Sequence, residues 1–532
     1  MSRNRRARRR NGLALLTALA LAATAACGST VPGAGTVAAG GGVSAEGGAV
    51  GGDGLSVAPP GSAQAPGSTV GSSSGALGGV PGTVPGGTGT TSGGSTSAGT
   101  SSGAAAGAPG AAPGAPGAGA PAAAGATGPG VTAKTISIGI TYCSDCARAN
   151  AAAGAGGEDP GDTRRYMQAA LDEVNARGGV LGRKLVPVFH EQRASDPVDV
   201  SAQGACETFT KDNQVAIMYF RGDLFYDCGK KAGVLVGALA GGTGPTYEKF
   251  PNVFAPSFVR LERLYDVTVK AMVRAGWQKP EPKWPTGKIG LITWDDNEYR
   301  FAMKNGYLKA LSAAGLKDED VRYIAVPQNA NALADASAAI SNAVLSFREK
   351  GIDHVLIGDG PAGIFGGCGL TLLFLQSAKS QQYAPRYGFN SNNCPDFANH
   401  PKDQLVGMLG IDSVDTEAAN DQGIALNPVR ERCYSTMKKR GLPVGQDQTR
   451  NIAVLACEYA YFAEAVFQRA TNGTTLPSLI AAAESLGTSY RSPRSFGNRL
   501  GPRQHDGDAL FRALRFDEGC QCIRYTSKPF EP

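Results

Sequence analysis

Residues 134–140 read Lys-Thr-Ile-Ser-Ile-Gly-Ile, an alternation of apolar and polar side chains that is typical of a half-buried strand. A helix is expected after Asp162, its N-cap, and it should end at Asn-Ala-Arg-Gly-Gly (175–179), where glycine can adopt the left-handed conformation. Its buried face is formed by Tyr166, Met167, Ala170, Leu171 and Val174. Lys184 to Phe189 then forms a second strand. This order predicts a βαβ unit with two parallel strands, and open sheets of this kind bind ligands at the carboxyl ends of their strands.

The same stretch carries a family resemblance. The run Asn-Ala-Arg-Gly-Gly-Val-Leu-Gly-Arg-Lys-Leu at 175–185, after a strand, a loop and an amphipathic helix, resembles the opening of type I periplasmic solute-binding proteins. The most similar group is the branched-chain amino-acid-binding (leucine/isoleucine/valine) group of ABC transporters, and the resemblance spans roughly residues 134–526. It implies an α/β fold of two lobes, each a parallel sheet flanked by helices, with hinge crossovers between them.

The first 27 residues are expected to be a targeting segment. Six arginines between residues 3 and 10 precede an apolar run at 13–26 that is short for a membrane span. Small residues precede Cys27, which resembles a bacterial lipobox, although Thr24 stands where a lipobox usually has leucine. We expect Cys27 to be lipidated and the protein to be anchored to the outer face of the cell membrane. The alternative is an ordinary secretory signal, which would leave the protein secreted.

Residues 28–130 consist almost entirely of Gly, Ala, Ser, Pro and Thr, with Glu46 and Asp53 as the only charges. Such a segment cannot bury enough apolar surface to offset its conformational entropy, so we expect a disordered linker. The folded domain is then 131–532, where 45 basic residues balance 43 acidic ones. No basic run interleaves with aromatic residues, so nucleic-acid binding has little support.

The length of the folded part favours two lobes. We expect lobe 1 to comprise about 131–258 and 391–505, and lobe 2 about 259–390 and 506–532. In this division the apolar stretch Leu405–Ile411 returns to the first lobe. Phe511–Phe516 and Cys520–Tyr525 read as a hairpin with its turn at 517–519.

Ten cysteines remain beyond Cys27, and in an exported chain an even number predicts up to five disulfides. Cys143 and Cys146 form a Cys-x-x-Cys pair that admits a redox role, but a structural disulfide is favoured because no Trp flanks it and the main helix begins later. A zinc site has less support. Among distant cysteines, the expected pairs are Cys206 with Cys228 and Cys368 with Cys394. No metal or cofactor is expected.

Two loops of the first lobe follow strands and are candidate ligand-binding segments. The first contains Arg221, Gly222 and Asp223, and the second contains Gly242 and Thr243. The resemblance implies that these positions grip a ligand's carboxylate and ammonium, although a Ser-rich turn is replaced here by charged residues. Glycine-rich loops can donate backbone N–H groups to an anion. Alternatively, Arg221 and Asp223 pair on the surface and the glycines only form a tight turn.

The second lobe supplies three further candidates at strand ends. Tyr299 matches the tyrosine that faces the ligand in the resembled family, although Arg300 replaces the glycine that usually follows. Asp359 ends a buried strand and could substitute for the family's glutamate, which is missing here. Asn390 ends another strand at the cleft. The resemblance therefore implies a small polar ligand, amino-acid-like or a related metabolite, in the cleft between the lobes.

The expected function is that of an extracytoplasmic solute-binding lipoprotein that works with an ABC permease and touches the membrane only through its lipid anchor. An enzyme is not expected: the four histidines are scattered, and no Gly-x-Ser-x-Gly or histidine-rich metal motif is present. A ligand-sensing or cell-wall interaction lipoprotein without transport is the alternative, because a fold does not fix its function.

Overall fold

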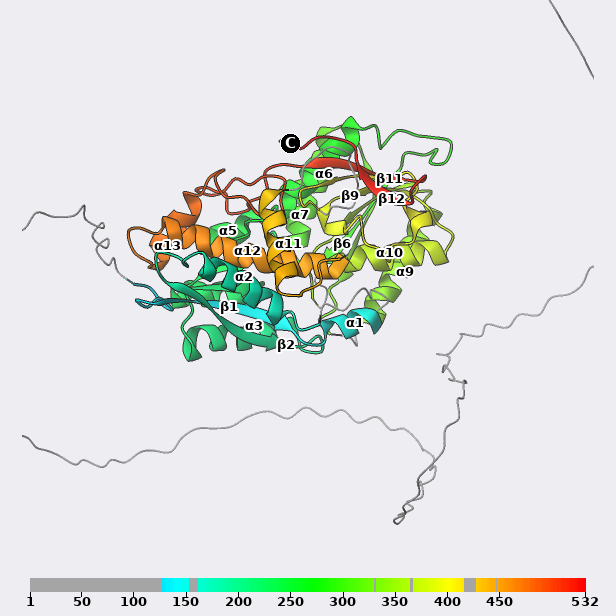
Figure 1. The fold of residues 1–532 in the computed structure, drawn as a ribbon. Coiled ribbons are helices and arrows are strands. Elements are labelled where there is room, and N and C mark those ends of the chain that lie inside the picture. The colour runs from blue at the N-terminus through cyan, green and yellow to red at the C-terminus, as the bar shows by residue number, and fades with distance from the viewer. Residues whose placement is uncertain (1–126, 153–160, 330–331, 364–366, 416–426, 446) are drawn as a thin grey trace, which may run out of the picture. The chain divides into compact units, whose positions relative to one another are not determined.

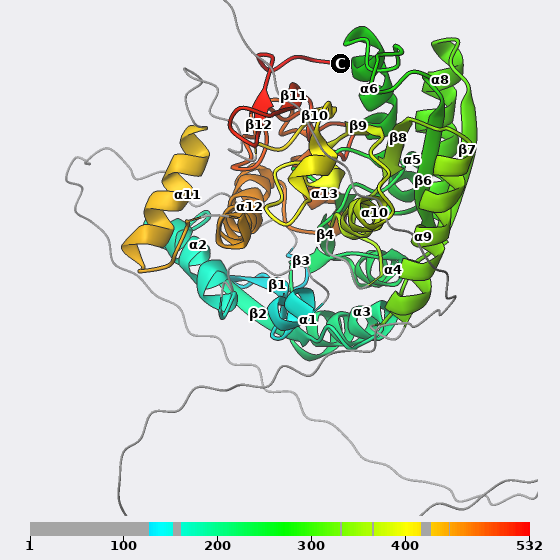
Figure 2. The same ribbon diagram turned by 90° about the vertical axis from the view of Figure 1, so that its right-hand side faces the viewer.

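The computed structural model describes residues 127–152, 161–329, 332–363, 367–415, 427–445 and 447–532. The targeting segment, Cys27 and the linker up to residue 126 lie outside these ranges. The described part contains two sheets, each flanked by helices (Figures 1 and 2). We call the sheets with their helices the first and the second lobe.

The first lobe is built on a parallel sheet of five strands in the order β2-β1-β3-β4-β5. The strands are β1 (Thr135–Cys143), β2 (Lys184–Gln192), β3 (Ile217–Phe220), β4 (Leu235–Ala238) and β5 (Val253–Phe254). Strands β1 and β2 pair in parallel from Thr135 opposite Lys184 to Cys143 opposite Gln192. The predicted βαβ unit is therefore confirmed, with its helix at Arg164–Ala176.

Helices from two distant parts of the chain cover this sheet. From the first part come α1 (Cys146–Ala152), α2 (Arg164–Ala176), α3 (Val198–Glu207), the π-helical turn η1 (Thr208–Asp212), α4 (Asp223–Ala232) and α5 (Gly244–Lys249). From the second part come α11 (Pro428–Lys439), α12 (Asp447–Arg469) and α13 (Leu476–Glu484). Helix α12 packs along α2 (Figure 1), and the two share one core with the sheet, to which Leu171, Val174 and Phe462 contribute fully buried side chains. Each such side chain contributes roughly 1.5–3 kcal/mol through the hydrophobic effect.

The second lobe contains a mixed sheet of seven strands in the order β12-β11-β10-β9-β8-β6-β7. The strands are β6 (Ile289–Asp295), β7 (Asp318–Ala325), β8 (His354–Gly358), β9 (Arg386–Phe389), β10 (Leu409–Asp412), β11 (Arg512–Asp517) and β12 (Cys522–Tyr525). Neighbouring strands from β7 to β10 are parallel, whereas β11 and β12 form an antiparallel hairpin beside β10. The expected C-terminal hairpin is thus confirmed.

The helical segments of the second lobe are mostly short. They are α6 (Leu261–Arg274), α7 (Asn297–Ala302), the π-helical turn η2 (Met303–Leu308), α8 (Lys309–Ala313), α9 (Leu333–Glu349), α10 (Gly369–Ser380), and the 3₁₀ turns η4 (Ser391–Asn393) and η5 (Lys402–Leu405). Helix α6 packs against η2, where the rings of Tyr265 and Tyr307 stack with centroids 4.1 Å apart. Together with α9 and α10, these elements enclose the core of the lobe.

One expectation about the division of the chain is wrong. Strand β10 (Leu409–Asp412) overlaps Leu405–Ile411, which was expected to return to the first lobe, but it pairs in parallel with β9 and antiparallel with β11. A short apolar run satisfies its backbone in either sheet, so its composition does not determine which one it joins. The return to the first lobe therefore comes after Asp412 rather than near residue 391.

Segments 255–260 and 485–511 are the first and the third crossover between the lobes, and the second crossover connects β10 to α11, of which the structure describes 413–415 and 427. They pair with one another through isolated bridges between Ala255 and Asp506 and between Val414 and Ser495. This bundle of crossovers is the hinge of the molecule. Within the described ranges, no helix is both long and apolar enough to span a bilayer.

Candidate ligand site between the lobes

Arg221 follows β3 directly and reaches the second lobe. Its Nη2 donates a hydrogen bond to the carbonyl oxygen of Gly363, 2.7 Å away, in the loop after β8. Burial lowers the pKa of Arg221, while the nearby Tyr299 and Tyr226 act in the opposite direction. Across the described residues no carboxylate forms an ion pair with this guanidinium. A cation in this state can accept a carboxylate from a ligand.

Asp223 does not share this position. It is exposed at the start of α4, and its carboxylate accepts a hydrogen bond from Lys249 Nζ at 2.6 Å. The alternative of a surface pair between Arg221 and Asp223 is therefore wrong, because Asp223 pairs with Lys249. Gly222 lies between the two with φ +97°, a conformation that favours glycine, and this turn separates the directions of its charged neighbours.

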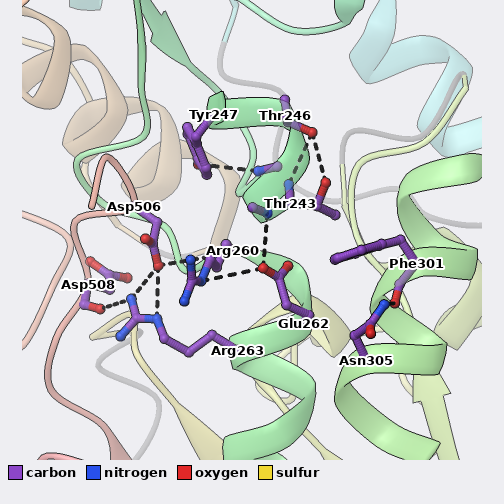
Figure 3. A network of polar contacts seen from close by, with 12 residues as sticks. Thr243, Thr246, Tyr247, Arg260, Glu262, Arg263, Phe301, Asn305, Asp506 and Asp508 are labelled. Atoms are coloured by element: carbon purple, nitrogen blue, oxygen red, sulfur yellow. Dashed lines mark hydrogen bonds and ion pairs between the residues drawn. The ribbon is translucent and has the colours of Figure 1, made fainter. Parts of the chain in front are cut away.

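The loop after β4 is closed by its own hydrogen bonds (Figure 3). The amide of Gly242 donates to the Tyr247 hydroxyl at 3.3 Å, and that of Thr243 donates to the Thr246 hydroxyl at 3.2 Å. The next amide, at Gly244, donates to Glu262 Oε1 at 2.9 Å. All three N–H groups therefore have partners in the protein, including those of Gly242 and Thr243, which we expected to be available to a ligand. Thr243 serves as the N-cap of α5.

Glu298 of α7 faces this loop from the second lobe. Its Oε1 accepts a hydrogen bond from the Thr246 hydroxyl, so the contact joins the two lobes. Burial raises the pKa of Glu298 to about 7, and the charges of Asp296, Asp223 and Glu262 act in the same direction. The sequence reasoning passed over this residue. Its position next to Tyr299 in the acidic turn was the signal that could have identified it.

Tyr299 lies beside Glu298 and is only 4% exposed. Its hydroxyl donates to the carbonyl of Pro361 at 3.1 Å. Burial raises the pKa of Tyr299, and both the positive Arg221 and the negative Glu298 act on it. Tyr226 of the first lobe also feels both charges. Arg221 and Glu298 are therefore placed around the same two tyrosines, one from each lobe.

Asp359 is fully buried, and the hydrogen-bonding capacity of its carboxylate is already used within the protein. Its carboxylate accepts hydrogen bonds from the Trp294 indole at 3.1 Å, the Gly360 amide at 2.8 Å, and the Thr371 amide and hydroxyl, both at 2.7 Å. Burial raises the pKa of Asp359 to about 7. With no exposed surface and four donors, this side chain holds the Gly360 loop in place rather than offering an oxygen to a ligand.

Asn390 is likewise fully buried. Its Oδ1 accepts from the Asn392 amide at 3.0 Å as the N-cap of η4, and its Nδ2 donates to the Tyr307 hydroxyl at 2.8 Å. The structure thus brings Arg221 and Tyr299 together where the two lobes meet. It places Asp359 and Asn390 beneath the surface of the second lobe, where they shape the loops that carry the site.

The ten cysteines of the folded domain form five disulfides. The pairs are Cys143–Cys146, Cys206–Cys228, Cys368–Cys394, Cys433–Cys457 and Cys520–Cys522. The first three are the pairs expected from the sequence. In the described ranges, one close group of potential metal ligands consists of Cys143, Asp145 and Cys146. Because both cysteines are in a disulfide, neither offers a thiolate to a metal.

Comparison with solved structures identifies the fold. The chain is similar to a fatty acid ABC transporter substrate-binding protein from Thermomonospora curvata, with 16% identity, a TM-score of 0.53, and coverage of 77% of this chain and 95% of that one. It is similar to a solute-binding protein from Rhodopseudomonas palustris in complex with 3,4-dihydroxybenzoic acid, with 14% identity, a TM-score of 0.53, and coverage of 75% and 97%. A Desulfitobacterium hafniense substrate-binding protein in complex with Leu has 15% identity, a TM-score of 0.50, and coverage of 74% and 100%.

At these identities the likeness shows the fold, a two-lobed α/β architecture with parallel sheets flanked by helices, and confirms that expectation. None of the curated proteins matches the chain. The model of the family described as "Periplasmic binding protein" matches residues 149–520, most of the folded part, and the chain therefore belongs to that family.

Proposed function

We propose that this protein binds a small zwitterion, an amino acid or a close relative, between its two lobes and delivers it to an ABC permease. Membership of the periplasmic binding protein family supports the binding role. Several similar structures carry names of ABC transporter substrate-binding or solute-binding proteins, which supports the role in transport.

The observation that carries the proposal is the pair of opposite charges around Tyr299 and Tyr226. Arg221 lacks a carboxylate partner among the described residues, and a guanidinium binds a carboxylate through two parallel hydrogen bonds. Glu298 has one oxygen bound to Thr246, and its second oxygen has no hydrogen bond with any residue that the structure describes, so it can accept from a ligand's ammonium group. The ligands named for three similar structures, a fatty acid, 3,4-dihydroxybenzoic acid and Leu, all contain a carboxyl group.

Domain closure follows from the same contacts. The bond from Arg221 to Gly363 and the bond from Thr246 to Glu298 each join one lobe to the other. A ligand that contacts Arg221 on one side and Glu298 on the other gains both sets of interactions only when the lobes are together. Binding therefore shifts the population towards the closed state, which is the state that a permease can distinguish.

The proposed location rests on the N-terminal sequence. Lipidation at Cys27 would hold the protein at the outer face of the membrane, where a permease takes up its ligand. Replacement of Cys27 by Ser should release the protein into the medium, and failure of labelled palmitate to enter the wild-type protein would contradict lipidation.

The test of the binding function is to denature the purified full chain and identify released small molecules by mass spectrometry. A panel of amino acids, aromatic acids and fatty acids is then titrated by calorimetry into the refolded, ligand-free protein. Saturable one-site binding of an amino acid is the expected result. Tight binding of a ligand without an ammonium group would leave the cleft as the site but remove Glu298 as its partner, and no binding of any carboxylate would contradict the proposal.

A further inference from the structure

A second group of charges surrounds a cavity where the first and third crossovers meet. The cavity has a volume of about 300 Å³ and lies beside the start of α6. Its charged lining residues are Arg260, Arg263, Arg499, Arg503, Asp506 and Glu531. Four guanidinium groups thus face two carboxylates, and none of these residues belongs to the ligand site described above.

One pair in the cavity wall is fixed. Arg263 donates to Asp506 Oδ2 from Nε at 2.9 Å and from Nη2 at 2.5 Å, and it also donates to the carbonyl of Asp508 at 2.6 Å (Figure 3). Asp506 is only 2% exposed, and it accepts a further bond from the Arg260 amide at 3.2 Å. This buried pair joins α6 to the third crossover, and the other guanidinium groups are arranged around it.

The remaining arginines are less completely engaged. Arg499 pairs with Glu531 at 2.5 Å, but both side chains are about half exposed, so the pair is weak and exchangeable. Arg260 Nε is buried without a hydrogen bond, although Glu262 Oε1 lies 3.4 Å away. Arg503 has no hydrogen bond or ion pair with any residue that the structure describes. The cavity is therefore lined by more guanidinium groups than carboxylates that pair with them.

We propose that the cavity binds a small oxyanion of the phosphate class. Planar guanidinium groups recognise tetrahedral oxyanions through paired hydrogen bonds, and several converging forks favour a multivalent anion over chloride. Arg260 comes from the first crossover, whereas Arg499 and Arg503 come from the third. A bound anion would hold these two crossovers together and act on the hinge.

The site also has a route to the ligand cleft. Arg260 lies 3.4 Å from Glu262, and Glu262 accepts the amide of Gly244 in the loop after β4 (Figure 3). An anion that draws Arg260 towards the cavity competes with Glu262 for it. The inference concerns a site separate from the cleft, so it does not depend on which solute the protein carries.

The experiment is a calorimetric titration of the ligand-free full chain with inorganic phosphate at low ionic strength, with glycerol phosphate in a second arm and sodium chloride as the blank. Saturable one-site binding of phosphate is expected. Equal or tighter binding of glycerol phosphate would assign the site to phosphate monoesters rather than to the free ion. Absence of saturable heat with both, into the millimolar range, would overturn the proposal.

Four variants locate the binding. Arg503→Gln and Arg260→Gln should each weaken phosphate binding on the order of five- to tenfold, the usual effect of a lost charge-assisted contact. Arg491→Gln is the matched control, because Arg491 is exposed on the same crossover and does not line the cavity. Glu531→Gln removes an internal competitor for Arg499 and should tighten binding.

These variants also distinguish phosphate binding in this cavity from unspecific attraction of phosphate to exposed arginines. Equal weakening by Arg491→Gln and Arg503→Gln, or no gain in Glu531→Gln, would contradict binding in this cavity. An Arg221→Met variant should lose the cleft ligand but keep phosphate binding. A failure of the proposed transport function and a failure of this anion site therefore give different results.

Discussion

We call the strand ends of the two lobes that face each other the two walls, and the polar groups that follow these strands are in opposite states. On the first-lobe wall, Arg221 makes one hydrogen bond, to Gly363, and has no carboxylate partner among the described residues. On the second-lobe wall, Asp359 accepts four hydrogen bonds and has no exposed surface. Both residues directly follow a parallel strand of a sheet. Their difference shows that the end of a strand provides a position, while the remaining hydrogen-bonding capacity decides whether a side chain can bind a ligand.

The largest effect should follow from removing the saturated carboxylate. Asp359→Ala leaves the Trp294 indole N–H and the amides of Gly360 and Thr371 without their acceptor in the interior. Each unsatisfied buried donor costs about 1–3 kcal/mol, so we expect a loss of at least about 3 kcal/mol in the free energy of unfolding. Urea denaturation measures this loss.

Asp359→Asn is the control for this change, because it keeps one acceptor oxygen and the side-chain volume and should cost less. If Asp359→Ala retains the stability of the wild type but loses ligand binding, then Asp359 faces the ligand after all and the contrast between the two walls fails.

The disulfides provide a second comparison, because each wall has one. Cys206–Cys228 joins α3 to α4, the helix that follows Arg221, and Cys368–Cys394 joins the start of α10 to the end of η4. Their sequence separations are 22 and 26 residues, so chain entropy predicts a similar contribution of roughly 3–3.5 kcal/mol from each. Paired Cys→Ser variants of each bridge, compared by denaturation, measure it.

A clearly larger loss of stability in the variant without Cys368–Cys394 would contradict the expected similar contributions of the two disulfides. It would mean that the disulfide, rather than the hydrogen bonds to Asp359, holds the second-lobe loops. Thiol titration of the denatured, unreduced protein is the control, and it should detect no free thiol from the ten cysteines of the folded domain.

The third prediction concerns Arg221, which has no carboxylate partner among the described residues. Arg221→Met keeps the aliphatic length of the side chain but removes the charge. We expect the affinity for a carboxylate ligand to fall by about 2–3 kcal/mol, because the ligand's carboxylate would be desolvated without its partner. Calorimetry with the ligand found by mass spectrometry gives the change, and denaturation should show little loss of stability.

Arg193→Met is the matched control, since this arginine also directly follows a strand of the first lobe, β2, but is 66% exposed and lies 4.0 Å from Glu191. Unchanged affinity in Arg221→Met would place the ligand's carboxylate elsewhere and would remove the main support for the proposed site.

Much of the fold could be predicted because local patterns determine it. The βαβ unit from β1 to β2 depends on alternation, a helical apolar face and a glycine stop, and all three are properties of adjacent residues. The sheet that contains β10 could not be predicted, because a four-residue apolar strand fits either lobe and long-range packing decides between them. Because β10 belongs to the second lobe, the chain returns to the first lobe after Asp412 and not near residue 391.

The site was only partly predictable for a related reason. A sequence shows which polar residues follow strands, but it does not show which of them are consumed by internal hydrogen bonds. Arg221 and Asp359 were indistinguishable at that level, and the loop amides of Gly242 and Thr243 were taken by side chains only a few residues away. Glu298 was missed because its partner, Thr246, lies in the other lobe and 52 residues earlier in the chain.

The smallest predicted effect concerns Glu298, whose contact with Thr246 depends on protonation. Burial in the closed arrangement raises the pKa of Glu298 from its ordinary value of about 4.5 to about 7. Opening exposes the carboxyl group to water and returns its pKa towards the ordinary value. Between these two values the closed form therefore binds more protons than the open form, and closure must weaken as the pH rises through this window.

In the ligand-free protein we expect the closed population to decrease between about pH 5 and pH 7 and to change little above that range. Fluorescence energy transfer between dyes placed on the two lobes measures this population. Glu298→Gln carries no titrating group but keeps an acceptor for the Thr246 hydroxyl, so its closure should depend much less on pH. Glu262 contributes in the same direction, because burial also raises its pKa and its bond from Gly244 joins the lobes, so a residual slope in the variant is assigned by adding Glu262→Gln. If closure strengthens as the pH rises, Glu298 is ionised in the closed state of the ligand-free protein, and protonation of this residue does not favour closure.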